Sequence, residues 1–185
     1  MQVDTHAHAH FNAYKDDYQE VIQRSLDKGT IINLVGTQSD TSKRAVEVAE
    51  MFDNVYASVG LHPEHLFSKH VDEEETTFLS REESCDYEYY KKLCSSPKVI
   101  AIGECGLDYY RLSGDLDWQR RRFRTHIRAA RECGKPLVIH TRSAAADTLA
   151  IMREERAGDV GGGAGRDVAH VGLLELLAQK VRERA

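Results

Sequence analysis

Three histidines near the start of the chain have a spacing that suits a shared metal ion. They are His6, His8 and His10, in the segment VDTHAHAH that begins at Val3. Side chains at positions i and i+2 of an extended strand point to the same face, so the imidazoles of His6 and His8 are predicted to lie together. Imidazole is a ligand that divalent cations such as zinc prefer. A fragment of an expression tag or a polar strand end is the alternative, but a tag would be an unbroken histidine run.

Further candidate ligands follow short apolar runs elsewhere in the sequence. His62 follows VYASVGL, Glu104 ends KVIAIGE, and His140 follows PLVI. In parallel βα sheets, functional residues gather at the carboxyl ends of the strands. These residues and the first two histidines are therefore predicted to meet at one rim and to bind a divalent cation. A cation held in this way lowers the pKa of bound water, which is chemistry that suits hydrolysis.

The elements that must position these residues alternate between strand and helix patterns. Short apolar runs predict parallel strands near residues 1–5, 31–36, 55–60, 99–104 and 137–140. Apolar residues at helical spacing predict helices near residues 17–28, 39–52, 87–94, 115–133 and 144–156. In the longest of these helices, the core-facing side chains are predicted to be Trp118, Phe123, Ile127 and Ala130. This alternation predicts an α/β fold built on a parallel sheet.

Three segments depart from the alternating pattern, and one helix is unusually basic. Residues 68–83 are acidic and lack periodicity, which predicts a solvated loop. Residues 159–167 read DVGGGAGRD, a composition typical of a flexible joint, and residues 171–184 predict a final amphipathic helix. Six arginines lie between Arg120 and Arg131. A solvated outer helix face is the favoured interpretation of these arginines, and a nucleic-acid-binding stripe is the alternative.

Composition narrows the class of protein. The chain has 185 residues, of which 41% are hydrophobic and 30% charged, which is typical of one soluble globular domain. It contains neither the apolar run of about 18 residues that a membrane helix needs nor the pattern of a signal peptide. Its four cysteines are scattered, which predicts reduced thiols and a cytoplasmic location. The net charge of −5 provides no general attraction to nucleic acid, so a phosphate-bearing substrate would need a local site or a metal.

Four motifs together resemble a known family. VDTHAH, GLHP, AIGECGLDYY and PLVIHTR are similar, in this order, to the signatures of the TatD family of metal-dependent hydrolases within the amidohydrolase superfamily. The resemblance covers residues 1–157 and implies a TIM-barrel-like (β/α)8 architecture. Here that barrel is expected to be incomplete, with about five βα units plus a C-terminal helix. The implied organisation is a TatD-like partial barrel over residues 1–157 and a glycine-rich joint and helix over residues 158–185.

The resemblance also implies a function and a metal site. Members of this family are hydrolases with one or two divalent cations (Mg, Mn or Zn) that cleave phosphodiesters, with 3′–5′ exonuclease activity on DNA. His6 and His8 resemble ligands of one cation, and Glu104 resembles the carboxylate that bridges two cations. His140 resembles a ligand of the second cation.

Two further positions resemble residues that line the substrate pocket in this family, and these are His62 and Arg142. Arginine suits bidentate contact with phosphate, although a surface salt bridge is the alternative. Asp108 is predicted to order its loop rather than to touch a metal. Four histidines have no counterpart in the motifs and are treated as ordinary polar residues: His10, His65, His70 and His126.

The sequence also departs from the family pattern. The family has a histidine after strand six, in a His-Cys-Phe-like segment, and an aspartate after strand eight, in a Glu-Thr-Asp segment. Neither segment occurs in the 185 residues, and His170 is a weak substitute for the histidine. The family's aspartate resembles the group that takes the proton from the attacking water, so the catalytic general base of this chain is unknown. Metal binding at lower affinity and weak hydrolysis are therefore expected.

Several alternatives stay open on the sequence alone. The same rim could hydrolyse a small ester, lactone or amide, or the chain could be a non-catalytic, truncated metal-binding product. A sheet of five strands cannot close into a barrel, so its two open edges are expected to favour a homo-oligomer. No membrane partner is expected, and DNA is the expected substrate.

Overall fold

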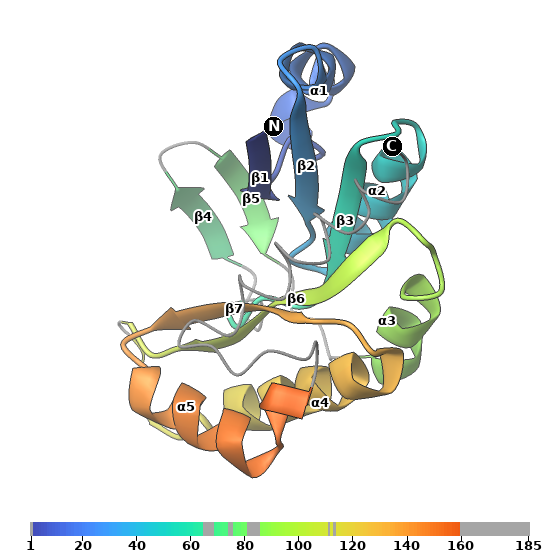
Figure 1. The fold of residues 1–185 in the computed structure, drawn as a ribbon. Helices are drawn as coiled ribbons and strands as arrows, with labels where there is room; N and C mark the ends of the chain where they lie inside the picture. Colours follow the sequence, from blue (N-terminus) through green and yellow to red (C-terminus); the bar gives the residue numbers. More distant parts are fainter. Residues whose placement is uncertain are drawn as a thin grey trace.

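A computed structural model of the chain describes residues 2–64, 69–73, 76–80, 86–110, 112 and 114–159. Its main sheet has five strands in the order β1-β2-β3-β6-β7, and every neighbouring pair is parallel. The strands are β1 (Gln2–Ala7), β2 (Thr30–Val35), β3 (Val55–Val59), β6 (Val99–Asp108) and β7 (Leu137–Arg142). The sheet curls strongly, so that β6 and β7 run across the direction of β1 and β2 (Figure 1). The five predicted strands and the incomplete TIM-barrel-like fold are thereby confirmed.

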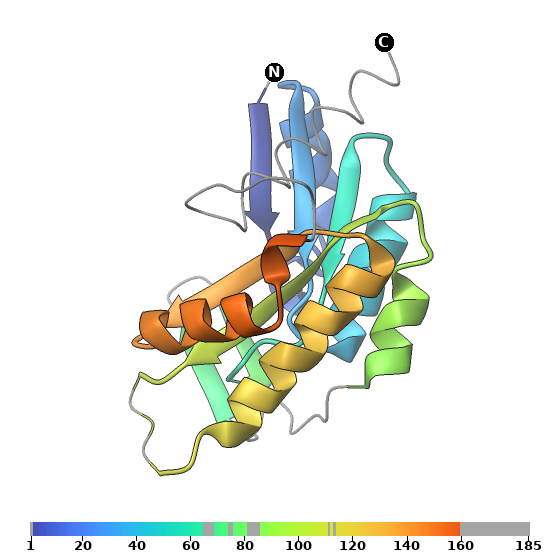
Figure 2. The same ribbon diagram turned by 60° about the horizontal axis from the view of Figure 1, so that its bottom comes forward.

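Helices follow the strands of this sheet and pack on one side of it. They are α1 (Tyr18–Leu26), α2 (Ser39–Glu50), α3 (Tyr87–Leu93), α4 (Asp117–Cys133) and α5 (Ala145–Glu154), with 3-10 turns at Asn12–Tyr14 and Ala157–Asp159. The helices α4 and α5 lie side by side against β6 and β7 (Figure 2). Each predicted helix within the described residues is present, with ends shifted by a few residues.

Apolar side chains cover both faces of the central strands. On the helix side, Leu34 of β2 packs in a core with Ile22, Val48 and Phe123 from three helices. A smaller cluster of strand residues lies on the opposite face: Ile31, Val35, Tyr56, Ile100, Ala101 and Val138. Parallel strands that are buried on both faces have nearly continuous apolar runs, which explains why these strands could be identified from the sequence.

The acidic segment 68–83 was wrongly predicted to be a loop. It contains β4 (Lys69–Glu73) and β5 (Thr76–Ser80), which pair antiparallel in a separate two-stranded sheet. The acidic residues obscured the pattern, although Thr76 and Thr77 are β-branched and favour extended backbone. The glycine-rich joint and the final helix, apart from the last described residue at position 159, lie outside the described residues. The domain boundary after residue 157 therefore stays a prediction.

The inner face of α4 differs by one residue from the prediction. Phe123, Ile127 and Ala130 are buried as expected, but Trp118 is only partly buried and carries the Arg122 guanidinium above its ring. Gln119 is fully buried instead, because its side-chain amide makes two hydrogen bonds to the backbone of β6. A polar residue therefore takes the inward position at the start of this helix.

Two glycines allow β6 to pass very close to β7. A Cβ atom on Gly103 would lie 2.2 Å from the carbonyl oxygen of Val138, and one on Gly106 would lie 2.0 Å from that of His140. Both glycines also have φ angles near +140° (+141° and +142°), which other residues rarely adopt. The motif Gly-Glu-Cys-Gly thus fixes the distance between the strands that carry Glu104 and His140.

Candidate metal centre

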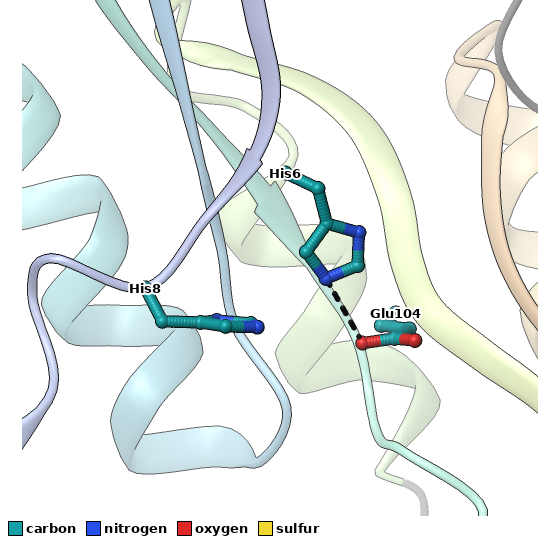
Figure 3. Close-up of side chains that lie close together, drawn as sticks. All are labelled: His6, His8 and Glu104. Atoms are coloured by element: carbon teal, nitrogen blue, oxygen red, sulfur yellow. Dashed lines mark ion pairs between the residues drawn. The ribbon is translucent and has the colours of Figure 1, made fainter. Parts of the chain in front are cut away.

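His6 and His8 lie beside Glu104 at the carboxyl end of the sheet. His6 belongs to β1 and His8 follows it, and Figure 3 shows both rings directed toward the Glu104 carboxylate of β6. The Nε2 atom of His6 lies 3.3 Å from Oε2 of Glu104. One ligand atom from each of the three residues lies within 4.8 Å of the others. These three side chains therefore form one candidate cation site.

The orientation of His8 is fixed by β2. Its Nδ1 atom lies 2.9 Å from the carbonyl oxygen of Val35, which can only accept a hydrogen bond. The hydrogen of the neutral ring is therefore at Nδ1, and the lone pair at Nε2 is available for a cation. Burial and the nearby His6 lower the pKa of His8, which favours this neutral form.

A second group shares Glu104 and lies on the side of β7. The Nδ1 atom of His140 is 3.2 Å from Oε1 of Glu104 and 3.0 Å from Nε2 of His62. Nε2 of His62 is 3.8 Å from the same carboxylate oxygen. The two oxygens of Glu104 thus face different histidines, His6 through Oε2 and His140 through Oε1. Glu104 could therefore contribute one oxygen to each of two divalent cations.

The charges at this rim also suit cation binding. Burial would by itself raise the pKa of Glu104, but hydrogen bonds from His140 and His6 hold that pKa far below its ordinary value. The hydrogen bond to Glu104 raises the pKa of His6, against the effect of burial. Burial lowers the pKa of His140, but Glu104 and Asp108 outweigh it and leave that pKa raised. The hydrogens of these imidazoles lie between the rings and the Glu104 carboxylate, where a divalent cation would bind. Binding of the cation would therefore release protons.

His62 is held by residues of two helices. Oγ of Ser42 in α2 donates to the carbonyl of Gly60 and accepts from its N–H, both at 3.1 Å. In α4, Nε2 of His126 accepts from the N–H of Leu61 at 3.0 Å, and the Arg122 guanidinium donates to the carbonyl of His62 at 3.3 Å. The GLHP segment is therefore fixed by its backbone, so its histidine is held in place at the rim.

Two of the histidines treated as ordinary polar residues are in fact buried. His126 is 1% exposed and His10 is 6% exposed. Burial lowers the pKa of His126 to about 4 and the pKa of His10 to about 3. The sequence offered a signal for His126, which lies between Phe123 and Ile127 on the inner face of its helix. His65 lies outside the described residues, and His70 belongs to β4.

Arg142 lies at the mouth of the rim and already has partners. Its Nε atom donates to Oδ2 of Asp108 at 2.7 Å, and its Nη2 atom contacts Glu64. Its side chain is 41% exposed. The salt bridge considered as an alternative to substrate binding is therefore present in this structure.

The arginines of α4 are mostly neutralised by α5 and its flanking residues. Arg120 pairs with Asp147, Arg124 with Glu154, and Arg128 with Glu155. Carboxylates alternate with guanidinium groups on this surface, which does not present a continuous positive stripe. The interpretation as a solvated outer face is consistent with this arrangement.

Comparison with known proteins identifies relatives for most of the chain. Residues 3–178 match the family described as TatD related DNase. The uncharacterized metal-dependent hydrolase YabD of Bacillus subtilis is 40% identical over 163 residues, which are 88% of this chain and 59% of that protein. The 3′-5′ ssDNA/RNA exonuclease TatD of Citrobacter koseri is 31% identical over 74% of this chain and 48% of its own length. The chain thus spans about half to three-fifths of the length of these two relatives.

Solved structures agree on the fold. The crystal structure of YJJV, a TatD homologue from Escherichia coli K12, superposes with a TM-score of 0.66 at 23% identity and covers 97% of this chain and 65% of that one. A TatD family hydrolase from Entamoeba histolytica has the same TM-score and identity over 84% of this chain and 54% of its own. Among the described residues, no helix is both long and apolar enough to span a membrane.

Proposed function

Since the chain belongs to the TatD family, we propose that it is a metal-dependent hydrolase that cleaves phosphodiester bonds in DNA from the 3′ end. The observation that carries this proposal is the shared carboxylate of Glu104, which faces one imidazole group through each of its oxygens. Additional support comes from the Citrobacter koseri relative, whose name describes a 3′-5′ exonuclease on single-stranded DNA and RNA. The cytoplasmic location stays a prediction.

We assign the cation ligands as His6 and His8 for one ion, Glu104 for both ions, and His140 for a second. When bound, a divalent cation at this rim would lower the pKa of water and neutralise charge on a phosphate. Imidazole and carboxylate ligands suit more than one of Mg, Mn and Zn, so elemental analysis of the purified chain is the measurement that identifies the cation.

His62 and Arg142 are assigned to the substrate. Nδ1 of His62 accepts a hydrogen bond from the N–H of Glu64 at 3.3 Å, so the neutral ring carries its hydrogen at Nε2. This hydrogen suits donation to a phosphate oxygen better than it suits ligation of a cation. Arg142 can bind phosphate through its Nη atoms by exchanging Glu64 for the substrate, while Nε stays on Asp108. The general base stays unassigned, because Glu104 and Asp108 are both held by imidazoles.

A nuclease assay tests this proposal. We expect the purified chain to shorten a 5′-labelled single-stranded DNA from its 3′ end with Mg²⁺, Mn²⁺ or Zn²⁺, and to stop in excess chelator. General acid–base catalysis contributes about 10²- to 10⁴-fold, so a rate lower by that order than that of the Citrobacter koseri exonuclease is expected if no side chain of these 185 residues acts as the general base. His140→Ala should abolish the remaining cleavage. Cleavage that persists both in chelator and in this variant would contradict the proposal.

We also propose that the open sheet edges mediate a homo-oligomer. Among the described residues, β1 pairs only with β2 and β7 pairs only with β6, so these two strands form the edges of the sheet. Unpaired N–H and C=O groups at an edge form a ready template for pairing with another chain. Light scattering should therefore show a dimer or larger species whose population rises with concentration. A constant monomer mass from low to high micromolar concentration is the result that would exclude this association.

A further inference from the structure

A second carboxylate lies behind the ring of His140. Oδ2 of Asp108, in β6, is 2.8 Å from Nε2 of His140, on the side of the ring opposite Glu104. The Asp108 side chain is fully buried. In the parallel register of β6 and β7, Gly106 pairs with His140 and Asp108 pairs with Arg142, so the carboxylate lies one step beyond the histidine along the ladder.

Asp108 is fixed at every polar atom. The side-chain amide of Gln119, at the start of α4, accepts a hydrogen bond from the backbone N–H of Asp108 and donates one to the backbone C=O of Asp108, both at 2.8 Å. Its Oδ1 atom accepts from the N–H of Tyr110 at 2.8 Å, as the predicted loop-ordering role requires. Its Oδ2 atom accepts from Arg142 as well as from His140, and the guanidinium offsets the unfavourable burial of a carboxylate. This carboxylate therefore has little freedom to turn away from the ring.

The contact decides which nitrogen of His140 can bind a cation. Each ring nitrogen of His140 faces a carboxylate that accepts hydrogen bonds, Glu104 at Nδ1 and Asp108 at Nε2. A cation bound beside Glu104 would take the place of a hydrogen at Nδ1, whereas Asp108 keeps the hydrogen of the neutral ring at Nε2. Nδ1 then presents its lone pair toward Oε1 of Glu104 and Nε2 of His62. Carboxylates that orient a ligating histidine in this way typically contribute about 10- to 100-fold to metal affinity.

We infer that Asp108 is a positioning residue for the second cation, because it holds His140 in the tautomer that ligates through Nδ1. This inference rests on the proposed metal centre. In it, Asp108 orients the ligand His140 and is not itself a ligand. The same carboxylate oxygen also orients Arg142, so one buried group aligns a cation ligand and a substrate-binding residue. Even spacing in GECGLD, with Glu104 and Asp108 four residues apart in one strand, is the sequence signal for this pairing.

The test titrates Asp108→Asn and wild-type protein with Co²⁺. Binding is monitored by calorimetry and by the visible absorption of Co²⁺. Asparagine has nearly the same shape, but one of its two terminal atoms donates hydrogen bonds. If the NH2 group of this asparagine takes the position of Oδ1, it faces the N–H of Tyr110, which is also a donor. If the NH2 group takes the position of Oδ2, it faces His140 and Arg142 and favours the His140 tautomer with its hydrogen at Nδ1. We expect the second Co²⁺ to bind about 10- to 100-fold more weakly, while binding of the first, at His6 and His8, is unchanged.

A matched control and a spectroscopic readout separate this role from general structural damage. Asp147→Asn removes a carboxylate with similar partners, the Tyr109 hydroxyl at 2.8 Å and Arg120 at 3.1 Å, away from the cation ligands, and should leave both affinities unchanged. In the Zn²⁺-loaded wild type, nitrogen NMR should show His140 with hydrogen on Nε2, and this signal should be lost or shifted in Asp108→Asn. Equal affinities and the same tautomer in both proteins would overturn the inference. Failure of the wild-type chain to bind a second cation would instead overturn the proposed two-cation centre.

Discussion

Replacement of Glu104 by alanine is expected to remove both cations from the protein, which is the largest single effect of any substitution at this rim. Its Oε2 atom faces His6 and its Oε1 atom faces His140, so each candidate site loses its carboxylate at once. The remaining ligands would all be neutral imidazoles, which do not compensate the charge of a divalent cation. Elemental analysis after dialysis against limiting metal should therefore find one or two cations per wild-type chain and close to none per variant chain.

The control for this experiment is another glutamate to alanine substitution. Glu47 lies on the exposed face of α2, beside Lys43 and Arg44, and its side chain is 48% exposed. Glu47→Ala should keep the wild-type metal content, because surface pairs of this kind contribute little to stability and lie away from the rim. If the Glu104 variant retains the full cation content, the shared carboxylate is not a ligand and the two-cation arrangement is wrong.

The part of the site that could be predicted from the sequence depends on strand geometry alone. His6 and Glu104 end or interrupt apolar strand runs, and the carboxyl ends of parallel strands meet at one edge. The two-residue period of a strand then accounts for the pairing of His6 with His8. Local pattern and fold class are enough for this part of the site, and the structure brings the predicted residues together at one rim.

The contacts that the sequence did not predict depend on tertiary packing. His62 lies against His140, 78 residues away, because helix residues fix the backbone on either side of it. Asp108 could be placed in its loop, but its contact with His140 requires the close approach of β6 and β7 at Gly106. A local sequence pattern does not determine how closely two strands approach each other, so such contacts can be identified only from the folded structure.

The error at the start of α4 has the same origin. Helical periodicity favours the large apolar Trp118 as the inward residue, whereas the fold places the amide of Gln119 there. The backbone N–H and C=O of Asp108 need partners when they are buried, and Gln119 supplies both. Satisfaction of buried backbone groups thus outweighs the hydrophobic pattern at this position.

His126 makes the fold sensitive to acid. Its Nε2 atom accepts from the N–H of Leu61 at 3.0 Å, and its Nδ1 atom donates to the carbonyl of Arg122 at 2.9 Å. A second hydrogen at Nε2 would face the N–H of Leu61, and the ring is fully buried. Burial is the main cause that lowers the pKa of His126 from 6.5 to about 4.

The sign of the pH dependence follows from this lowered pKa. Between pH 6.5 and about 4 the unfolded chain takes up a proton at His126 and the native chain does not, so the free energy of unfolding decreases as the pH falls. The contribution of His126 is complete above pH 6.5. About 3 kcal/mol of it is expected to be lost by pH 4, because each pH unit between the two pKa values corresponds to about 1.36 kcal/mol. His10, with a pKa lowered to about 3, acts in the same direction.

Urea unfolding of wild-type protein and of His126→Gln, both in chelator, measures the contribution of His126. Glutamine does not titrate, so the variant should lose less stability than wild type between pH 7.5 and pH 4.5, although it is less stable at pH 7.5. His10, and the raised pKa values of His6 and His140, affect both proteins alike and therefore cancel in the difference. Parallel stability curves over this pH range would mean that the native chain takes up a proton at His126 as readily as the unfolded chain does. In that case the hydrogen bond between His126 and the N–H of Leu61, in the GLHP segment, would not be the acid-sensitive element of the fold.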